Sequence, residues 1–113
     1  KHEFVVELAK SPEQLAQGLM FRRKMASDNG MLFLFGKKQY ASMWMKNTYI
    51  SLDMLFIDED GYVTGIAQNT IPESLENIYS KVRIFAVLEL NAGTAKALDI
   101  KKGAMVVHSA FDK

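Results

Sequence analysis

The 113-residue chain contains no cysteine, two prolines, two histidines and one tryptophan. Without cysteine it has no disulfide framework, no thiolate nucleophile and no thiolate metal site, which fits an exported protein and a cytosolic one equally well. No apolar run approaches the roughly 20 residues that a membrane-spanning helix needs, and no signal peptide is visible. The chain starts at Lys1 instead of a methionine, so removal of an upstream segment is compatible with the sequence.

The chain also lacks a bias in charge. Fourteen basic residues against thirteen acidic ones give a formal net charge of +1, so bulk charge gives no reason to expect nucleic acid or an anionic membrane as a partner. The length is that of one domain with one core, which we place over residues 1–113.

Motifs for metal or nucleophilic chemistry are missing as well. His2 and His108 are far apart in the sequence, and zinc needs three or four good ligands. Met43, Met45 and Met54 could hold monovalent copper, but methionine more often fills a core. No hydrolytic triad, phosphate loop or dinucleotide fingerprint is recognisable. We therefore expect no cofactor and no metal.

The apolar pattern predicts a β-rich fold. Strands are expected near residues 4–8, 31–35, 40–46, 52–57, 62–68, 83–90 and 104–108. A break is expected at residues 36–39, and Gly65 inside a strand indicates a bulge or a close approach of another backbone. Ser11-Pro12-Glu13-Gln14 has the residues of a capping box and predicts a short helix ending near Met20, and a second helix is expected near residues 95–98. The fold class is α+β, a mostly antiparallel curled sheet or small β-barrel with two short helices.

The segment from Met43 to Asp58 is the predicted site, because it places a compact polar set between apolar runs. Trp44 either covers the end of the core or forms a ligand-stacking wall beside Lys46 and Asn47. Asn47 and Thr48 serve either turn structure or ligand contact. We expect Trp44, Asn47 and Asp53 to lie in or beside one pocket.

Two carboxylates stand inside apolar strands and need partners there. Asp53 and Glu89 are candidates for buried ion pairs or for acid/base chemistry, and two carboxylates facing one cavity would suit glycosidic bond cleavage. Arg22 is expected to form a charged hydrogen bond with Asp53 or Glu89, or to bind an anionic ligand group.

An ordered series of blocks resembles a known family. The blocks are Gly18-Leu19-Met20-Phe21-Arg22, Gly30-Met31-Leu32-Phe33, Trp44-Met45-Lys46-Asn47-Thr48, Leu52-Asp53 with Phe56-Ile57-Asp58, Val87-Leu88-Glu89-Leu90 with Gly93, and Gly103. Together they resemble the domain of unknown function 192 family, from about Phe4 to Val107. The resemblance implies a compact β-rich fold, a bacterial or archaeal origin and many exported relatives, and it implies no established activity.

These observations favour a small-ligand binding or accessory domain of the cell envelope, for a saccharide or another polar metabolite. The ligand contacts would come from Arg22, Trp44, Lys46, Asn47, Thr48, Asp53 and Glu89. Two alternatives stay open: a small hydrolase or lyase using paired carboxylates, and a protein-interaction domain without a small-molecule site. Export to the periplasm or the extracellular space is the favoured location, with the cytoplasm as the alternative.

Overall fold

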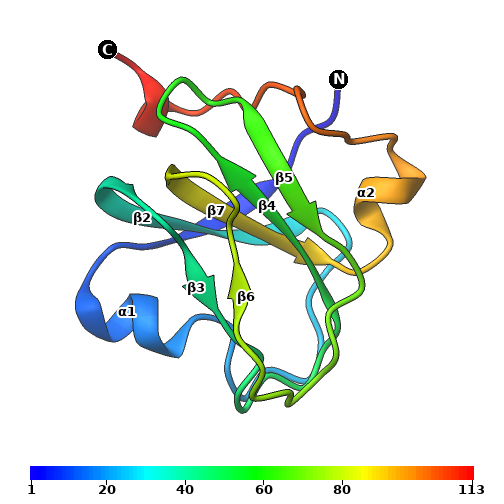
Figure 1. The fold of residues 1–113 in the computed structure, drawn as a ribbon. Helices are drawn as coiled ribbons and strands as arrows, with labels where there is room; N and C mark the ends of the chain where they lie inside the picture. Colours follow the sequence, from blue (N-terminus) through cyan, green and yellow to red (C-terminus); the bar gives the residue numbers. More distant parts are fainter.

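The computed structural model describes all residues 1–113 and contains two β-sheets with short helices at their margins (Figure 1). The five-stranded sheet has the order β1-β2-β7-β4-β5, and β3 pairs with β6 in a second, two-stranded sheet. The elements are β1 (Val5–Ala9), α1 (Pro12–Gln17), β2 (Asn29–Gln39), β3 (Ser42–Met43), β4 (Leu52–Ile57), β5 (Val63–Ala67), β6 (Ile78–Tyr79), β7 (Ile84–Asn91), α2 (Thr94–Ala97) and a 3-10 turn (Ser109–Phe111).

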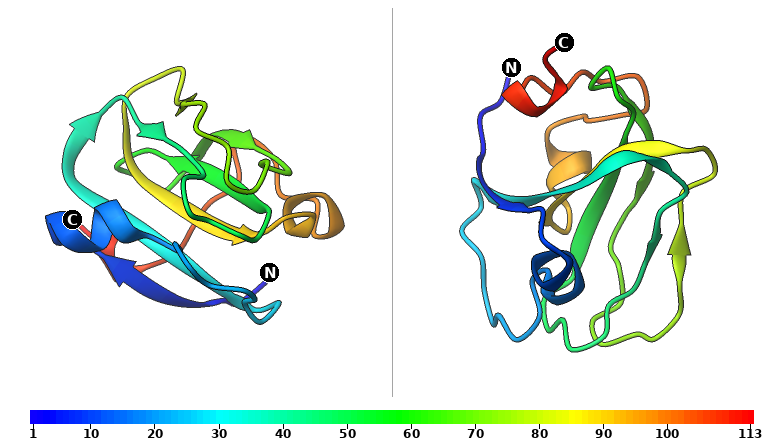
Figure 2. Two further views of the ribbon diagram at one scale, coloured as in Figure 1. Left: turned by 90° about the horizontal axis from the view of Figure 1, so that it is seen from below. Right: turned by 90° about the vertical axis from the view of Figure 1, so that its left-hand side faces the viewer.

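Strand β7 is the centre of the large sheet. It runs antiparallel to both β2 and β4, while β1 is parallel to β2. The strand order begins at β1 and ends at β5 without a pairing between them, so the sheet curls (Figure 2) but stays open. The α+β class with a mostly antiparallel curled sheet is confirmed, and a closed barrel is not formed.

The large sheet is covered on both faces, which explains why all six residues of β4 are buried. One face, here called the α1 face, carries Met31, Phe33, Met54 and Val87 and packs against Leu15 of α1 and Met43 of β3. The other, here called the C-terminal face, carries the strand residues Leu32, Leu55, Ala86, Leu88 and Leu90. Residues of the C-terminal segment cover this face, namely Ile100, Ala104, Val106 and Phe111.

The start of α1 is fixed by the predicted capping box. The Ser11 hydroxyl accepts a hydrogen bond from the Gln14 amide at 3.1 Å, and the Gln14 side chain accepts one from the Ser11 amide at 3.1 Å. The helix stops at Gln17, short of the predicted Met20, because Gly18 takes a φ of 49°.

Several strand boundaries differ from the sequence prediction. The break expected at residues 36–39 interrupts the pairing but does not end the strand: β2 has no partner on β7 between Leu34 and Gln39, where Gly36 takes a φ of 80°, yet it extends to Gln39. The expected strand at 40–46 shortens to Ser42–Met43. The strand expected at 104–108 is reduced to one bridge between Tyr62 and Met105.

The bulge predicted at Gly65 is confirmed. Phe56 pairs with Gly65 while Ile57 pairs with Val63, which leaves Thr64 as the extra residue on β5. Such an insertion bends the strand and increases its twist, and it adds to the curl of the sheet beside β4.

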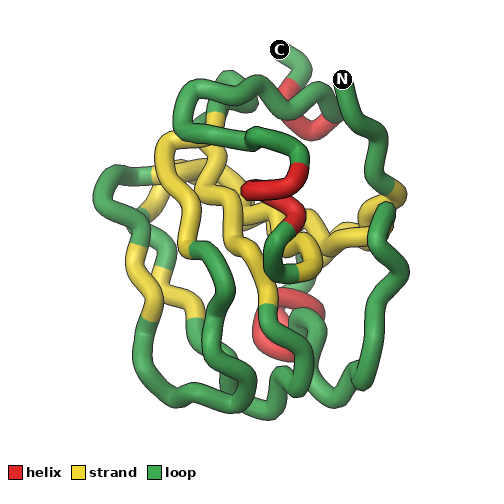
Figure 3. Tube along the Cα trace, turned by 90° about the vertical axis from the view of Figure 1, so that its right-hand side faces the viewer, coloured by secondary structure: helices red, strands yellow, loops and turns green.

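Both chain termini lie at one end of the molecule, and loops form the opposite end (Figures 1 and 3). We call this the loop end; it comprises the loops that follow α1, β3 and β5. None of the helices has the length and apolar character that crossing a membrane requires.

Candidate functional site

A cavity of about 200 Å³ lies on the α1 face of the sheet, towards the loop end. The C-terminal half of α1 and the following turn form one wall, and β3 with the residues after it forms another. The lining residues are Leu15–Met20, Phe33, Ser42–Met45, Thr48, Leu52 and Glu89. Glu89 is the only ionisable residue among them, so we call this space the Glu89 cavity.

Glu89 lies in the middle of β7, directly opposite Met31 of β2 and Met54 of β4. These pairings place its side chain on the α1 face, because paired residues of neighbouring strands point the same way. The residue is only 4% exposed and takes part in none of the salt bridges. Every side-chain nitrogen or oxygen that is fully shielded from solvent has a hydrogen-bond partner. The Glu89 carboxyl has no such partner, so its oxygens are not fully shielded and open into the cavity that Glu89 lines.

Burial raises the pKa of Glu89 from 4.5 to about 8, and no neighbouring charge contributes to that shift. The carboxyl is therefore mostly protonated at pH 7. In that state it can donate a hydrogen bond to a ligand, and it can lose the proton when a cation arrives. Buried polar groups normally have a protein partner, so an unpartnered carboxyl facing a cavity is a candidate binding group.

Trp44 forms part of the cavity wall while remaining 43% exposed. The Lys46 ammonium lies 5.1 Å from the centroid of the Trp44 ring system, in a cation–π contact. Thr48 also lines the cavity, and its hydroxyl donates to the Lys46 carbonyl at 3.1 Å. Lys46 and Asn47 do not line the cavity, so a direct ligand contact from either stays a prediction.

The loop end concentrates unusual backbone conformations. Phe21, Asn47, Asn69 and Glu73 have φ values of 69°, 55°, 52° and 63°, and only one further non-glycine residue has a positive φ. Backbone hydrogen bonds hold these loops together: the Phe21 amide donates to the Asn47 carbonyl at 2.8 Å, and the Glu73 amide to the Thr48 carbonyl at 2.9 Å. Strain of this kind clusters at functional sites, and here it borders the Glu89 cavity.

The expectation that Asp53 shares a pocket with Trp44 and Asn47 is wrong. Asp53 is paired with Leu90 and belongs to the C-terminal face. Its two carboxylate oxygens accept hydrogen bonds from the Asn69 amide at 3.0 Å and the Ala95 amide at 2.9 Å. Asp53 is thus a buried structural acceptor that ties α2 to the sheet, and it does not face Glu89.

The expected ion pair between Arg22 and a buried acid is also wrong. Arg22 forms a bidentate salt bridge with Glu7 of β1, at the surface. The hydrogen bond from Arg22 lowers the pKa of Glu7. The buried acids need no arginine, because backbone amides satisfy Asp53 and Glu89 retains its proton.

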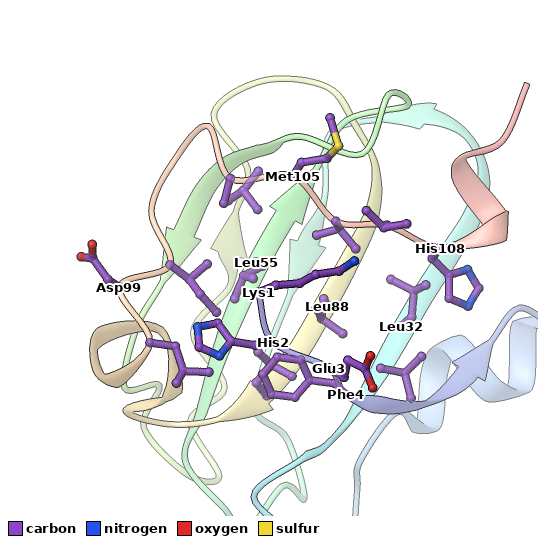
Figure 4. Close-up of a pocket in the computed structure, with 18 residues that line it drawn as sticks. Lys1, His2, Glu3, Phe4, Leu32, Leu55, Leu88, Asp99, Met105 and His108 are labelled. Atoms are coloured by element: carbon purple, nitrogen blue, oxygen red, sulfur yellow. The ribbon is translucent and has the colours of Figure 1, made fainter.

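A larger cavity of about 640 Å³ lies on the C-terminal face (Figure 4). Its floor includes Leu32, Leu55 and Leu88, and the charged residues around it, such as Lys1, Glu3 and Asp99, are exposed. No buried ionisable group lines this space. It has apolar area but no desolvated polar group to orient a ligand, so it ranks behind the Glu89 cavity as a binding site.

No group of three or more His, Asp or Glu side chains is arranged to hold a metal ion. Of the three methionines considered for copper, Met43 and Met45 line the Glu89 cavity and Met54 does not. Met20 lines it from the turn after α1.

The sequence prediction missed the contribution of Gln17, Ser42 and Phe33 to the cavity. Ser42 and Gln17 carry no sequence signal, because each is an ordinary polar residue in a short element. The block from Gly18 to Met20 did carry one, since it is part of the family resemblance, and the structure places it in the cavity wall.

The fold and the cavity define a small α+β domain in which a curled sheet presents one buried acid to a pocket. The chain belongs to the DUF192 family, described as "Uncharacterized ACR", which it matches over residues 1–108. No functionally curated protein matches it.

Two crystal structures are similar to this chain. One, from Sinorhizobium meliloti 1021, is provisionally described as a transcription regulator; it is 50% identical, with a TM-score of 0.91 over 93% of this chain and 81% of that one. The other, a protein of unknown function from Novosphingobium aromaticivorans DSM 12444, is 39% identical, with a TM-score of 0.92 over 95% of this chain and 76% of that one.

Proposed function

We propose that this domain binds a small ligand in the Glu89 cavity. The observation that supports the proposal is the Glu89 carboxyl itself, which is buried, unpaired within the protein and open to a cavity of about 200 Å³. A desolvated polar group in a pocket that is lined mainly by hydrophobic residues fixes the orientation of a ligand and provides specificity. Trp44 lies in the wall of the same cavity and provides apolar contact.

The lining favours a ligand with an apolar body and a polar end. Nine of the fourteen lining residues are hydrophobic, and Gln17, Ser42, Thr48 and Glu89 bring the polar side chains, whereas a saccharide is recognised through polar partners all around its ring. Among the small ligands expected from the sequence, a saccharide is therefore the less favoured one. Hydrolysis by paired carboxylates is also less favoured, because Asp53 belongs to the opposite face and no second acid lines the cavity.

A fragment screen by thermal shift and tryptophan fluorescence tests the proposal. Trp44 is the only tryptophan, so its emission reports binding at this cavity and not at the larger one. We expect at least one small ligand to shift both the melting temperature and the emission. Glu89→Leu should remain folded and lose both responses. If ligands shift the melting temperature equally in wild type and Glu89→Leu, without changing Trp44 emission, the binding site lies elsewhere.

A location in the cell envelope forms part of this proposal and rests on the family resemblance. Fractionation of cells that express the complete natural protein tests it, with recovery in the cytoplasm as the contrary result.

Regulation through DNA contact is less favoured, because the longest helix has six residues and the net charge is only +1. Major-groove readers usually insert a longer helix.

A protein-interaction role is the second candidate, and the exposed side chains of the loop end favour it. Phe21, Trp44, Tyr49, Ile71 and Leu75 are all partly or largely exposed, and the Phe21 and Tyr49 rings meet edge to face at 6.3 Å. Exposed apolar groups close together mark interaction surfaces. Replacing Ile71 and Leu75 with serine should abolish a partner complex and leave small-ligand binding intact. Unchanged association would exclude this surface.

A further inference from the structure

We propose that the Glu89 cavity selects a small organic cation, a compact aliphatic ammonium ion, whose charged group pairs with the Glu89 carboxylate. This inference rests on the proposed function and adds the chemical class of the ligand. It follows from three features of the cavity: the sign of its single charge, the nature of its walls, and its size.

The cavity offers one acidic group and no basic one. Arg22 is engaged with Glu7 outside the cavity, and Lys46 lies over Trp44 without lining the space. The segments that face Glu89 across the cavity are α1 and the turn after it, β2, β3, and the residues around Thr48 and Leu52. None of these segments places a titratable side chain in the cavity lining. An anionic ligand would therefore meet an acid with no compensating cation, and a monovalent cation would be neutralised by it.

The walls suit an apolar cation better than a strongly hydrated one. Leucine, phenylalanine and methionine side chains dominate them, and the thioethers of Met20, Met43 and Met45 are polarizable. The indole of Trp44, which already holds the Lys46 ammonium in a cation–π contact, adds apolar contact area to the wall. A divalent metal ion would carry one charge more than the single carboxylate neutralises, and it would find only one carboxylate, whereas such ions are usually held by more than one charged oxygen ligand.

The volume of about 200 Å³ is below the roughly 300–1,000 Å³ of sites for drug-sized ligands. The ligand is thus a molecule of few heavy atoms, such as an amine with a short carbon chain. A short alkyl chain would contact the leucine and methionine side chains while its ammonium group reaches the floor of the cavity.

Binding of such an ion is linked to a proton. Below pH 8 the Glu89 carboxyl is mainly neutral, since burial places its pKa at about 8. When the ammonium ion enters, the carboxyl releases its proton to solvent and the resulting carboxylate pairs with the ligand, so one proton leaves for each cation bound. Affinity should therefore rise with pH up to about 8 and level off above it.

The experiment compares three ligands with the same carbon chain and different charge. Butylamine, butan-1-ol and butyrate are titrated into the purified protein, with calorimetry and Trp44 fluorescence at pH 6, 7, 8 and 9. We expect butylamine to bind best. Its affinity should rise about fiftyfold between pH 6 and pH 8, because the ionised fraction of Glu89 is about fifty times larger at pH 8 than at pH 6. Calorimetry in buffers of different ionisation enthalpy should detect one released proton at pH 6.

Two variants complete the design. Glu89→Gln should remove both the preference for the amine and the pH dependence. The matched control Glu59→Gln changes an exposed acid in the turn between β4 and β5 and should behave as wild type. If butan-1-ol binds as tightly as butylamine, or if amine affinity does not vary with pH, the cation proposal fails while the binding function stands. If the wider fragment screen also gives no Trp44 response, the binding function fails with it.

Discussion

Asp53 and Glu89 belong to neighbouring strands, yet their carboxyl groups lie on opposite faces of the sheet. Glu89 is directly opposite Met54, the residue after Asp53, and Asp53 is opposite Leu90. Since successive residues of a strand point to opposite faces, this one-residue difference separates the two acids. Asp53 accepts two backbone hydrogen bonds, and Glu89 accepts none and opens to a cavity.

The buried carboxyl of Glu89 should make the protein less stable as the pH rises. Its pKa is about 8 in the folded protein against an ordinary 4.5, so the folded state binds more protons than the unfolded chain between these values. The free energy of unfolding then falls with pH over that interval, by up to about 1.4 kcal/mol per pH unit. Urea denaturation at pH 5, 6, 7 and 8 measures the slope. Glu89→Gln should flatten it, and an equal slope in both proteins would contradict the assignment.

Loss of the Asp53 carboxylate should destabilise the fold without affecting the cavity. Asp53→Ala leaves the buried amide of Ala95 without an acceptor, at a cost of about 1–3 kcal/mol, and removes the acceptor of the part-buried Asn69 amide, which water can partly replace. Denaturation measures the total, and hydrogen exchange should show faster exchange at these two amides. Asp53→Asn retains one acceptor oxygen and should lose less stability. A variant that keeps wild-type exchange rates at both amides would show that the carboxylate is not their partner.

The Arg22–Glu7 salt bridge should contribute little to stability. Both side chains are more than one-third exposed, and exposed ion pairs contribute about 0.2–1 kcal/mol. A double-mutant cycle with Arg22→Ala and Glu7→Gln measures the coupling energy, and we expect it to shrink further in 0.5 M salt. A coupling well above about 1 kcal/mol would contradict this expectation, because it would show that the Arg22–Glu7 pair contributes more than an exposed ion pair does.

Gly30 and Gly65 form a matched pair of strand glycines with different surroundings. A Cβ atom at Gly30 would lie 2.7 Å from the Glu89 carbonyl oxygen, whereas one at Gly65 would have its nearest neighbour at 3.9 Å. Gly30→Ala should therefore cost about 1–3 kcal/mol through overpacking against β7. Gly65→Ala should be neutral or stabilising, because alanine restricts the unfolded chain. Thermal denaturation of the two variants should separate them clearly, and equal melting temperatures would contradict the close approach at Gly30.

The elements with strong local signals were predictable from the sequence. The capping box at Ser11 fixes the start of α1, the apolar run 52–57 forms β4, and Gly65 marks the bulge. The boundaries that failed depend on tertiary pairing. Residues 36–39 look like a turn, but β2 only loses its pairing after Leu34 and resumes it at Gln39 opposite Ile84, and Met105 has a partner only at Tyr62.

The candidate site was predictable only in part. Trp44, Thr48 and Glu89 were selected from the sequence, and all three line the cavity. The misplacement of Asp53 came from register: proximity along a strand-turn-strand unit does not say which face a residue occupies, and one residue changes the answer. The Arg22 prediction failed because it assumed that buried acids need a cation, although backbone amides or a retained proton suffice.

The central position of β7 also governs how this protein can be made. Residues 84–91 provide the partner for both β2 and β4, so the sheet has no centre until residue 91 has left the ribosome. At about 5–20 residues per second, the nascent chain carries β4 without its β7 partner for roughly 2–7 s after Ile57 is synthesised, while β5 can already pair with the other edge of β4. During that interval the apolar segments 31–35 and 52–57 each have one unpaired edge, and a chaperone or a translocation apparatus meets an incomplete sheet rather than a finished domain.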